Sequence, residues 1–561
     1  MPKLTINRSD MKICEININS GDTLLQAISD AGVYLDAPCG GEGRCRKCLV
    51  YVKTEDLKKI STSQAQVNTI SILNSQFSIL IACLTYVNSD TTIYLPDETE
   101  MKIAGSLNQN MSCSSCECSK KRQFTKLGVA VDIGTTTVVA RLVDTTTGKI
   151  ISVASGANAQ RVYGADVISR IKYCSANGHE KLTKLIRVQI AALVRQMLSK
   201  IEGSDRLNGS DDISEGAAKI EQIVIAGNTI MQHLAAGYSP VSMGSVPFDT
   251  ISLFGTTTPV WEELLGLQVE VSPDAEIYYT PAIKAYVGGD ITAGILAFET
   301  AANFTPTGRE VEGHANSCFN FSPGGRKVKS TVLFLDIGTN GEIVLKHDGK
   351  YYCCATAAGP AFEGAEIEMG TAAVSGAISH VAWNEEKGEP ELTIIGETTP
   401  IGICGSGLLD TLAFLVESGK VDETGRLEQG GDNDKFYLTE SVYITSEDIR
   451  KLQLAKAAIA AGVQTLLHHV GISEVQVDAL ILAGGFGNYL DKKSAARIGL
   501  IPQSLLPVTH SLGNTAIEGA TIALFSENAR EELENIRERT QYIELSTNKI
   551  FNEQFIEQIM F

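Results

Sequence analysis

The sequence predicts a multidomain protein with α+β and α/β parts, and three observations lead to this prediction. The chain has 561 residues, which is more than one hydrophobic core normally accommodates. The first hundred residues combine short alternating segments with a loop rich in cysteine and glycine. The remainder repeats one strand–turn–strand pattern at half-domain spacing. We therefore expect a small N-terminal domain at 1–97, a linker at 98–126, and two related halves at 127–320 and 330–561.

The N-terminal region has the features of a small sheet that carries a metal cluster. Residues 3–7 and 12–18 alternate apolar and polar side chains, which predicts a β-hairpin. The four candidate ligands Cys39, Cys45, Cys48 and Cys83 have the spacing Cys-x5-Cys-x2-Cys-x34-Cys. Three thiolates on one glycine-rich loop and a distant fourth are the pattern of a plant-type [2Fe–2S] cluster. A zinc site is the alternative, although a zinc ribbon normally pairs two Cys-x2-Cys knuckles.

This region resembles the β-grasp ferredoxins, and its five-residue first gap is closer to the adrenodoxin branch than to the chloroplast branch. Three basic residues, Arg44, Arg46 and Lys47, lie within the cysteine loop. They are either solvated side chains or a basic rim that orients an acidic partner. The polar linker contains a second cysteine group, which reads as loose thiols or as an incomplete metal site: Cys113, Cys116 and Cys118.

The larger part of the chain contains two copies of a strand that ends in Asp-x-Gly-Thr and is followed by a second and a third strand. Glycine permits a hairpin whose backbone N–H groups face phosphate oxygens, and threonine adds a hydroxyl donor. An aspartate at the strand end can hold Mg²⁺ through the water shell of the ion. Two such hairpins that face each other would hold a polyphosphate from both sides. The residues concerned are Asp132, Gly134, Thr135, Thr136 and Thr137 in the first copy and Asp336, Gly338, Thr339, Asn340 and Gly341 in the second.

Three further sites are candidates for nucleotide chemistry. Gly484, Gly485 and Phe486 follow an apolar strand, and a glycine pair there lets a flat base and ribose lie against the backbone; a plain tight turn is the alternative. Gly405 and Ser406 belong to a second glycine-rich turn. Asp166 precedes a helical segment, where it either positions water or Mg²⁺ or caps the helix.

In this order, the two hairpins and the later Gly-Gly turn resemble the acetate and sugar kinase, Hsc70 and actin superfamily. In that superfamily the hairpins are the phosphate loops and the Gly-Gly turn is the adenosine loop. The resemblance implies two RNase-H-like α/β halves with ATP in the cleft between them.

The whole chain resembles the ATP-dependent reductive activators of corrinoid proteins. The resemblance rests on the cluster cysteines, on the segments 131–136 and 335–342, and on Ala226-Gly-Asn228-Thr and Ala483-Gly-Gly-Phe-Gly-Asn488. It implies that the cluster passes an electron to an inactive Co(II) corrinoid protein and returns it to Co(I), with ATP and Mg²⁺ required. The partners implied are a Co(II) corrinoid protein and an upstream low-potential electron donor, with a homodimer left open. Asp132, Asp336 and Asp166 are then the candidate catalytic residues.

Composition excludes some function classes. The net charge of -19 argues against general nucleic-acid binding, which needs a basic surface. No run of 18 or more apolar residues and no apolar leader are visible, so we expect no membrane span and a cytoplasmic location. The 13 cysteines then read as metal ligands or free thiols rather than disulfides.

Three rival functions remain open at this point. A small-molecule kinase with a regulatory redox domain would need a base aimed at a substrate hydroxyl, and Asp166 is the candidate. A non-catalytic redox sensor would have a vestigial nucleotide site. The third rival is an ATP-gated activator of another low-potential enzyme. The activators of 2-hydroxyacyl-CoA dehydratases share the ATPase fold, but the cluster of these activators lies between subunits and they have no β-grasp domain.

Overall fold

A computed structural model describes the chain except for residues 9–10, 19–20, Gly32, Tyr34, 36–47, 63–67, 73–74, 96–125, 207–218, 266–270, 301–329, Ala365, 385–388, 429–433 and 488–489. The chain forms two compact units. The first unit comprises Met1–Met101 and Ala159–Gly178, and the second comprises Lys102–Asn158 and His179–Phe561.

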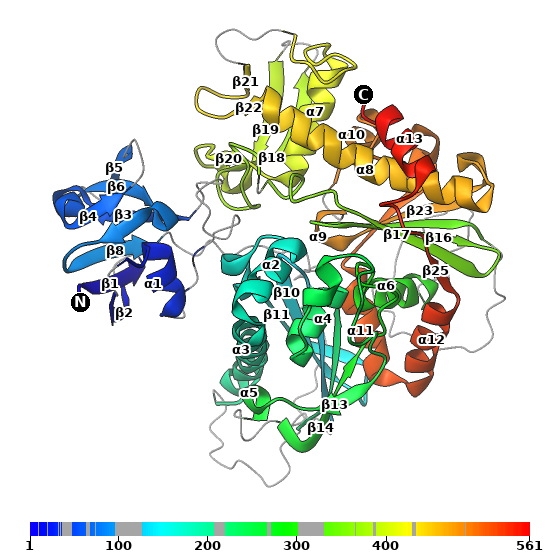
Figure 1. Cartoon of the computed structure of the whole chain (residues 1–561), viewed down its shortest axis with the longest axis horizontal. Coiled ribbons are helices and arrows are strands. Elements are labelled where there is room, and N and C mark those ends of the chain that lie inside the picture. The colour runs from blue at the N-terminus through cyan, green and yellow to red at the C-terminus, as the bar shows by residue number, and fades with distance from the viewer. Residues whose placement is uncertain are drawn as a thin grey trace. The chain divides into compact units, whose positions relative to one another are not determined.

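The N-terminal part of the first unit is a mixed sheet with one helix packed on it (Figure 1). Its elements are β1 (Lys3–Arg8), β2 (Met11–Asn17), α1 (Leu24–Asp30), β3 (Leu49–Lys53), η1 (Thr54–Lys59), β4 (Ile60–Thr62), β5 (Asn68–Ile72), β6 (Ser75–Ile81), η2 (Ala82–Leu84), β7 (Thr85–Val87) and β8 (Thr91–Leu95). The strand order is β2-β1-β8-β3-β6-β5, with β4 and β7 paired separately. Alternate side chains of the strands point to one face, so Leu4 and Ile6 of β1 are fully buried with Leu24 and Ile28 of α1. This arrangement confirms the β-grasp prediction.

A segment from later in the sequence belongs to the same unit. It contains η3 (Ala159–Tyr163) and α2 (Val167–Asn177). Val162 is a member of the buried cluster that forms the core of the N-terminal sheet, and Tyr163 packs against that cluster. The first unit is therefore built from two separate stretches of the chain.

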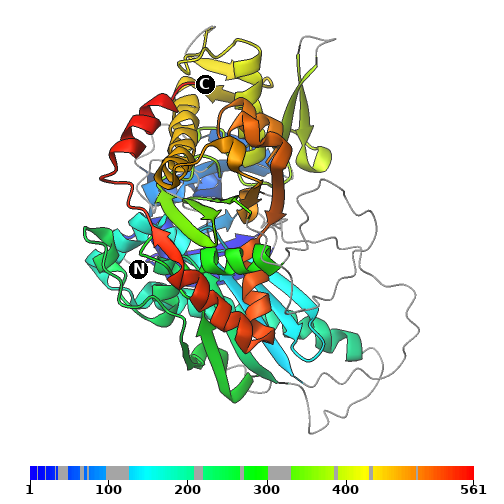
Figure 2. The ribbon, with the colours of Figure 1, turned by 90° about the vertical axis from the view of Figure 1, so that its right-hand side faces the viewer.

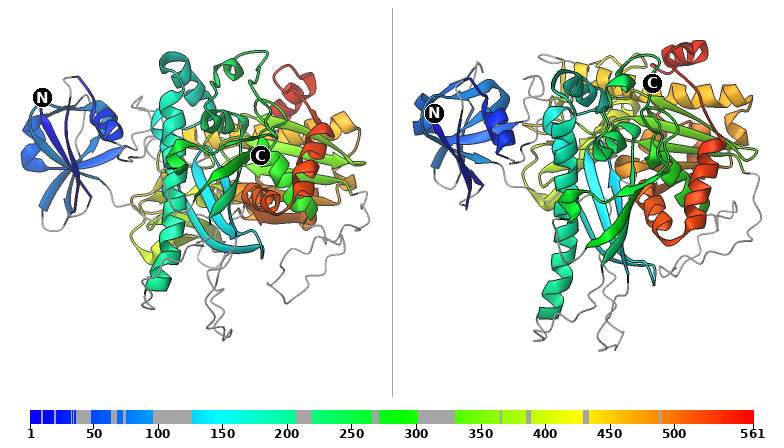
Figure 3. Two further views of the ribbon diagram at one scale, coloured as in Figure 1. Left: turned by 90° about the horizontal axis from the view of Figure 1, so that it is seen from below. Right: turned by 60° about the horizontal axis from the view of Figure 1, so that its bottom comes forward.

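The first half of the second unit is a mixed sheet in the order β11-β10-β9-β12-β14-β13. Its strands are β9 (Leu127–Ile133), β10 (Thr137–Asp144), β11 (Lys149–Ala157), β12 (Ile220–Gly227), β13 (Thr257–Pro259) and β14 (Val271–Tyr279), and its helices are α3 (Glu180–Arg206), α4 (Thr229–Ala236), α5 (Glu262–Leu265) and α6 (Gly289–Thr300), with η4 (Val241–Gly244). The strands β9, β10 and β11 form an antiparallel meander, and β12 and β14 extend it in parallel with β9. The long helix α3 lies along β10 and β11 (Figure 3).

The second half repeats this topology. Its sheet has the order β24-β23-β15-β16-β17-β25, from β15 (Val332–Ile337), β16 (Gly341–His347), β17 (Lys350–Thr356), β23 (Ala479–Ala483), β24 (Thr509–Gly513) and β25 (Thr540–Tyr542). The meander β15–β16–β17 is antiparallel, and β23 and β24 follow in parallel beside β15. Five strands of each half thus have the same order, which confirms the prediction of two RNase-H-like halves, whereas the sixth strand, β13 or β25, lies at opposite edges of the two sheets.

The other elements of this half lie outside its main sheet. They are β18 (Ala377–Asn384), β19 (Glu389–Ile394), η5 (Ile395–Glu397), β20 (Gly402–Ile403), α7 (Gly405–Glu417), β21 (Lys435–Tyr437), β22 (Tyr443–Thr445), α8 (Ser446–Val470), η6 (Glu474–Gln476), α9 (Gly484–Gly487), α10 (Lys492–Arg497), η7 (Gln503–Val508), α11 (Thr515–Phe525), α12 (Glu527–Glu538) and α13 (Lys549–Glu557). The helix α8 packs against β16 and β17, and α13 packs against α8. Among the described residues, no helix has both the length and the apolar composition that a membrane crossing requires.

The helices α6 and α11 cross at the junction of the two halves (Figures 1 and 2). Each belongs to one half by sequence and packs on the other, because Phe298 of α6 contacts Phe334 of β15 while α11 contacts β9 and β12. A Cβ on Gly519 of α11 would lie 2.0 Å from the carbonyl oxygen of Ala293 in α6. Glycine is therefore required for this close approach, which joins the two halves through one shared hydrophobic core.

Candidate functional site

The two Asp-x-Gly-Thr hairpin turns, at 134–136 and 338–340, are each closed by a hydrogen bond from the glycine N–H, although the first loop is one residue longer than the second. The Gly134 N–H donates to the Thr137 carbonyl over 2.9 Å, and the Gly338 N–H donates to the Asn340 carbonyl over 2.9 Å. A Cβ at Gly134 would lie 2.6 Å from the Thr137 carbonyl oxygen, so a larger residue does not fit there. Each turn therefore closes tightly at the end of a buried strand.

The turns meet across the junction of the two halves. The hydroxyl oxygens of Thr136 and Thr339 are 3.3 Å apart. The sequence predicted two hairpins that face each other, and the structure brings these two threonines together. Hydroxyl groups from both halves therefore border the same small space.

One carboxylate joins the two turns, and sequence reasoning missed it. Thr136 donates its hydroxyl hydrogen to Glu363 Oε2 over 2.6 Å, and Thr339 donates to Glu363 Oε1 over 2.8 Å. Glu363 lies in the loop that follows β17, the third strand of the second copy. No recurrence in the first copy marks this residue, so the repeat pattern could not reveal it.

Four more carboxyl groups lie near one another beside the turns, and we call the region that they form with the turns the cleft: Asp132, Asp290, Asp336 and Glu342. Burial, opposed by a hydrogen bond from Asn514 and by the nearby Arg141, raises the pKa of Asp132 to about 6. Burial and then repulsion by Asp132 raise the pKa of Asp336 to about 7.

Asp290 and Glu342 carry the other two carboxyl groups of the cleft. Burial and then repulsion by neighbouring carboxylates raise the pKa of each well above its usual value. Glu342 is the direct cross-strand partner of Asp336, and Asp290 lies in the first turn of α6. Like charges so close cannot all remain ionised without a cation, so this set favours a bound positive charge. Among the described residues, no three His, Cys, Asp or Glu side chains are arranged to hold a metal ion directly.

Side-chain amides hold the first turn in place. Asn514, the N-cap of α11, donates to Asp132 Oδ2 over 2.6 Å. Asn228, the N-cap of α4, donates to Thr135 Oγ1 over 3.0 Å, and Asn158 donates to the Gly134 carbonyl over 2.8 Å. Asn228 belongs to a segment that carries the family resemblance, whereas the only sequence signal for Asn514 is its place immediately before a helix, which predicts a cap rather than a site.

The predicted glycine turn lies against the second hairpin. Gly484 follows β23 with a φ of +86°, and a Cβ there would lie 2.4 Å from Asp336 Oδ1. Gly485 is exposed, and a Cβ there would meet nothing within 4 Å. The backbone of this turn is therefore open to solvent beside a cleft carboxylate. The side chain of Phe486 lies outside the described residues.

Other predicted residues are not brought to the hairpins by any hydrogen bond described. Gly405 and Ser406 begin α7, and Ser406 donates its hydroxyl hydrogen to the Ser379 carbonyl over 2.8 Å. Asp166 caps α2, and its two carboxylate oxygens accept from the backbone N–H and the hydroxyl of Ser169. The structure thus shows the capping interaction that the sequence left as an alternative for Asp166, and we leave this residue out of the mechanism below.

Two of the four predicted cluster ligands are described, and they lie together. Cys48 precedes β3 and Cys83 follows β6, and the antiparallel pairing of these strands brings their ends side by side. Both are buried, and the Cys83 backbone N–H donates to Cys48 Sγ over 3.4 Å. An N–H directed at a buried sulfur is the environment that an anionic iron–sulfur cluster needs, so these residues fit the group.

Several predicted positions lie outside the described residues. They include two of the cluster ligands, the basic loop residues and the linker cysteines: Cys39, Cys45, Arg44, Arg46, Lys47, Cys113, Cys116 and Cys118.

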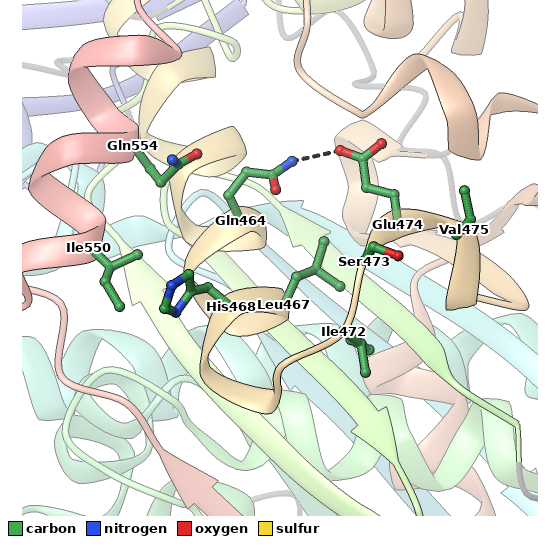
Figure 4. A pocket seen from close by; sticks show the side chains of 9 residues that line it. All are labelled: Gln464, Leu467, His468, Ile472, Ser473, Glu474, Val475, Ile550 and Gln554. Carbon is green, nitrogen blue, oxygen red and sulfur yellow. Dashed lines mark hydrogen bonds between the residues drawn. The ribbon is translucent and has the colours of Figure 1, made fainter.

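A separate pocket of about 460 Å³ lies between the end of α8, the turn that follows it and α13 (Figure 4). Gln464 donates to Glu474 Oε1 over 2.7 Å across its rim. None of the predicted site residues lines this pocket, so it is distinct from the cleft between the hairpins.

Comparison with known proteins agrees with this geometry. Residues 7–88 match the 2Fe-2S iron-sulfur cluster binding domain, residues 127–303 match the RACo middle region, and residues 330–561 match the C-terminal domain of RACo, the ASKHA domain. The corrinoid activation enzyme RamQ of Eubacterium limosum is 30% identical, over 98% of this chain and 97% of its own length. The chain belongs to the corrinoid-activating enzymes.

Two further relatives agree with this assignment. The [Co(II) methylated amine-specific corrinoid protein] reductase of Methanosarcina barkeri is 23% identical, over 76% of this chain and 75% of its own length. A solved structure of a reductive activator for a corrinoid, iron-sulfur protein superposes with a TM-score of 0.63 at 29% identity, and covers 100% of this chain and 98% of its own. The family predicted from the cysteines and the two hairpins is confirmed, as are the [2Fe–2S] domain and the ATPase-type fold.

Proposed function

We propose that this enzyme uses ATP to drive the transfer of one electron to a corrinoid protein, reducing inactive Co(II) to Co(I). The observation that carries the proposal is the meeting of Thr136 and Thr339 from two phosphate-type hairpins, 3.3 Å apart. They occur in one chain with a [2Fe–2S] domain, whose described ligands Cys48 and Cys83 are already in contact. Electron delivery and nucleotide binding are thus combined in one polypeptide.

The cluster site is formed by Cys39, Cys45, Cys48 and Cys83. A [2Fe–2S] cluster bound there would supply electrons one at a time. The chain contributes burial of Cys48 and Cys83 and the N–H donated by Cys83, which stabilise negative charge on sulfur.

The cleft of the second unit is the proposed site of ATP and Mg²⁺. The hydroxyls of Thr136 and Thr339 and the N–H groups of the two turns would donate to phosphate oxygens. Asp132 and Asp336 would hold Mg²⁺ through its water shell, with Asp290 and Glu342 adding negative charge behind them. The exposed turn at Gly484 and Gly485 would carry the adenosine.

A thermodynamic reason makes ATP necessary. Co(I) corrinoids are strong reductants, and a potential gap of ~0.2 V costs roughly 4–5 kcal/mol for one electron, at about 59 mV per tenfold. ATP can shift that equilibrium only if two states of the protein bind it with different affinity. The crossing of α6 and α11 is the element that would carry the change, because each helix packs on the opposite half of the cleft.

A reduction assay tests the proposal. Chemically reduced protein is mixed with a Co(II) corrinoid protein, with and without Mg-ATP, and Co(I) is followed by its absorbance. We expect Co(I) only with ATP, and none with the Cys83→Ser variant. Equal reduction with and without ATP, or no reduction of any corrinoid protein offered, would overturn the proposal.

A further inference from the structure

Glu363 occupies the space between the two hairpin turns. Its two carboxylate oxygens accept hydrogen bonds from Thr136 over 2.6 Å and from Thr339 over 2.8 Å. We propose that Glu363 is the catalytic carboxylate that orients and deprotonates the water that attacks ATP. This inference rests on the proposed function, because it requires ATP to be hydrolysed in this cleft.

The backbone around Glu363 is held rigidly. Its neighbours Ala361 and Phe362 are 3% and 1% exposed and belong to the hydrophobic core of the second half. The Glu363 N–H donates to the Pro360 carbonyl over 3.1 Å. Gly364 has a φ of +73°, and its carbonyl oxygen would lie 2.3 Å from a Cβ at Gly370. A buried aromatic residue and a packed glycine turn therefore fix the position of the Glu363 backbone beside the two turns.

The position suits a general base better than a metal ligand. A phosphate oxygen that replaced the carboxylate at the Thr136 and Thr339 hydroxyls would lie at ordinary hydrogen-bond distance from them. The backbone of Glu363 stays beside the two turns, so the displaced carboxylate would remain next to the terminal phosphate, where a water molecule can lie between them. That is the reach that general-base catalysis needs.

The other four carboxylates are better explained as the site of the cation. Asp132, Asp336, Asp290 and Glu342 repel one another, and their pKa values are raised. They are the groups that a bound Mg²⁺ would neutralise. Glu363 is not among the groups that raise those pKa values, it is only half-buried, and it alone is hydrogen-bonded to both turns among the described residues.

The proposed step is the hydrolysis of the bond between the γ-phosphorus of ATP and the β–γ bridging oxygen. The water oxygen forms a bond to the γ-phosphorus while the bond between that phosphorus and the β–γ bridging oxygen breaks, which yields ADP and inorganic phosphate. Glu363 takes one proton from the water and later returns it to phosphate or solvent. No oxidant or reductant takes part in this step.

The Glu363→Gln variant tests this role. Its amide oxygen can still accept from one threonine, so the turn keeps its shape, but it cannot accept the proton. We expect single-turnover hydrolysis of Mg-ATP to slow by about 100-fold or more. The Kd for Mg-ADP should change by less than about threefold.

Two further variants serve as controls. Glu366→Gln removes an exposed carboxylate from the same loop, and it should leave both hydrolysis and binding unchanged. Glu363→Asp keeps the base but shortens its reach, so it should retain more activity than the glutamine variant. If Glu363→Gln has a lower melting temperature than the wild type, the hydrolysis rate of Glu363→Asp is compared with that of the wild type instead.

One result would overturn the inference. A Glu363→Gln variant that hydrolyses ATP as fast as the wild type, or faster and with tighter ADP binding, would show that the carboxylate merely fills the phosphate site. Failure of the proposed function is distinguishable from this, because the hydrolysis assay contains no corrinoid protein. A wild type that hydrolyses ATP but reduces no corrinoid protein would contradict the proposed reaction and leave the role of Glu363 to be decided.

Discussion

The hydroxyls of Thr136 and Thr339 lie 3.3 Å apart although 203 residues separate them in the sequence. Each lies in the tight turn of one hairpin, and the two hairpins belong to halves in which five strands have the same order. The proposed nucleotide site is therefore the place where the two copies of one motif face each other. Four expected outcomes follow from the contacts around it and from the cluster domain.

Removal of either threonine hydroxyl should weaken nucleotide binding. Each of the variants Thr136→Val and Thr339→Val loses one donor to a charged phosphate, which contributes about 1.5–3 kcal/mol and corresponds to about 10–100-fold in Kd. Calorimetric titration with Mg-ADP measures the effect. Thr147→Val is the matched control, since Thr147 donates to Asp144 at the opposite end of β10. Equal weakening in the control would contradict a direct phosphate contact.

The Gly484→Ala variant should damage the site beyond its cost in backbone strain. The positive φ costs an alanine roughly 1–2 kcal/mol, and the added Cβ would also lie 2.4 Å from Asp336 Oδ1. Gly349 is the control, because it has a φ of +77° and open space around it. Both variants should lose similar stability in urea, but only Gly484→Ala should lose Mg-ADP affinity. Unchanged affinity in Gly484→Ala would place the adenosine elsewhere.

The Cys83→Ser variant should lose the cluster. Cys83 lies buried beside Cys48, so serine would remove one of the four proposed sulfur ligands. Iron and acid-labile sulfide content, together with the visible spectrum, measure the loss. Cys14→Ser, on β2 of the same domain, should keep both iron atoms. Full cluster content in Cys83→Ser would assign the fourth ligand to another residue.

Stability should depend on pH through His233. Burial lowers the pKa of this residue to about 4, and its ring contacts the Thr229 carbonyl at 2.7 Å and the Ser252 N–H at 3.3 Å. The unfolded chain takes up the proton first as the pH falls through about 6.5, so this contribution to stability is complete above that pH and is lost towards pH 4. The loss amounts to roughly 3 kcal/mol.

Urea denaturation at pH 7.5 and pH 4.5 measures this difference. The His233→Gln variant should be less stable at pH 7.5 and should show a smaller drop between the two values than the wild type. The exposed His468 serves as the control, and His468→Gln should show the wild-type drop. An unchanged drop in His233→Gln would show that other groups cause it. Protonation of His233 should also affect the first hairpin turn. The helix α4 carries His233, and its N-cap Asn228 donates to Thr135 Oγ1.

Much of the fold and part of the site could be predicted from sequence because they depend on local patterns. Alternation of apolar residues predicted the strands, and the repeat of Asp-x-Gly-Thr predicted two equivalent halves. Both signals arise within a few residues, since a tight turn needs glycine and a buried strand needs apolar side chains. The spacing of Cys39, Cys45, Cys48 and Cys83 predicted the cluster domain for the same reason.

The sequence by itself therefore determined the two halves, the hairpin turns and the family. Only the tertiary structure decided which side chains share the cleft. Glu363 reaches both turns because its loop is anchored by Phe362 in a core assembled from distant elements. Asn514 reaches Asp132 because α11 crosses α6 to pack on the opposite half. Glu363 and Thr136 are 227 residues apart and Asn514 and Asp132 are 382 apart, and contacts between such distant residues leave no periodic trace in the sequence.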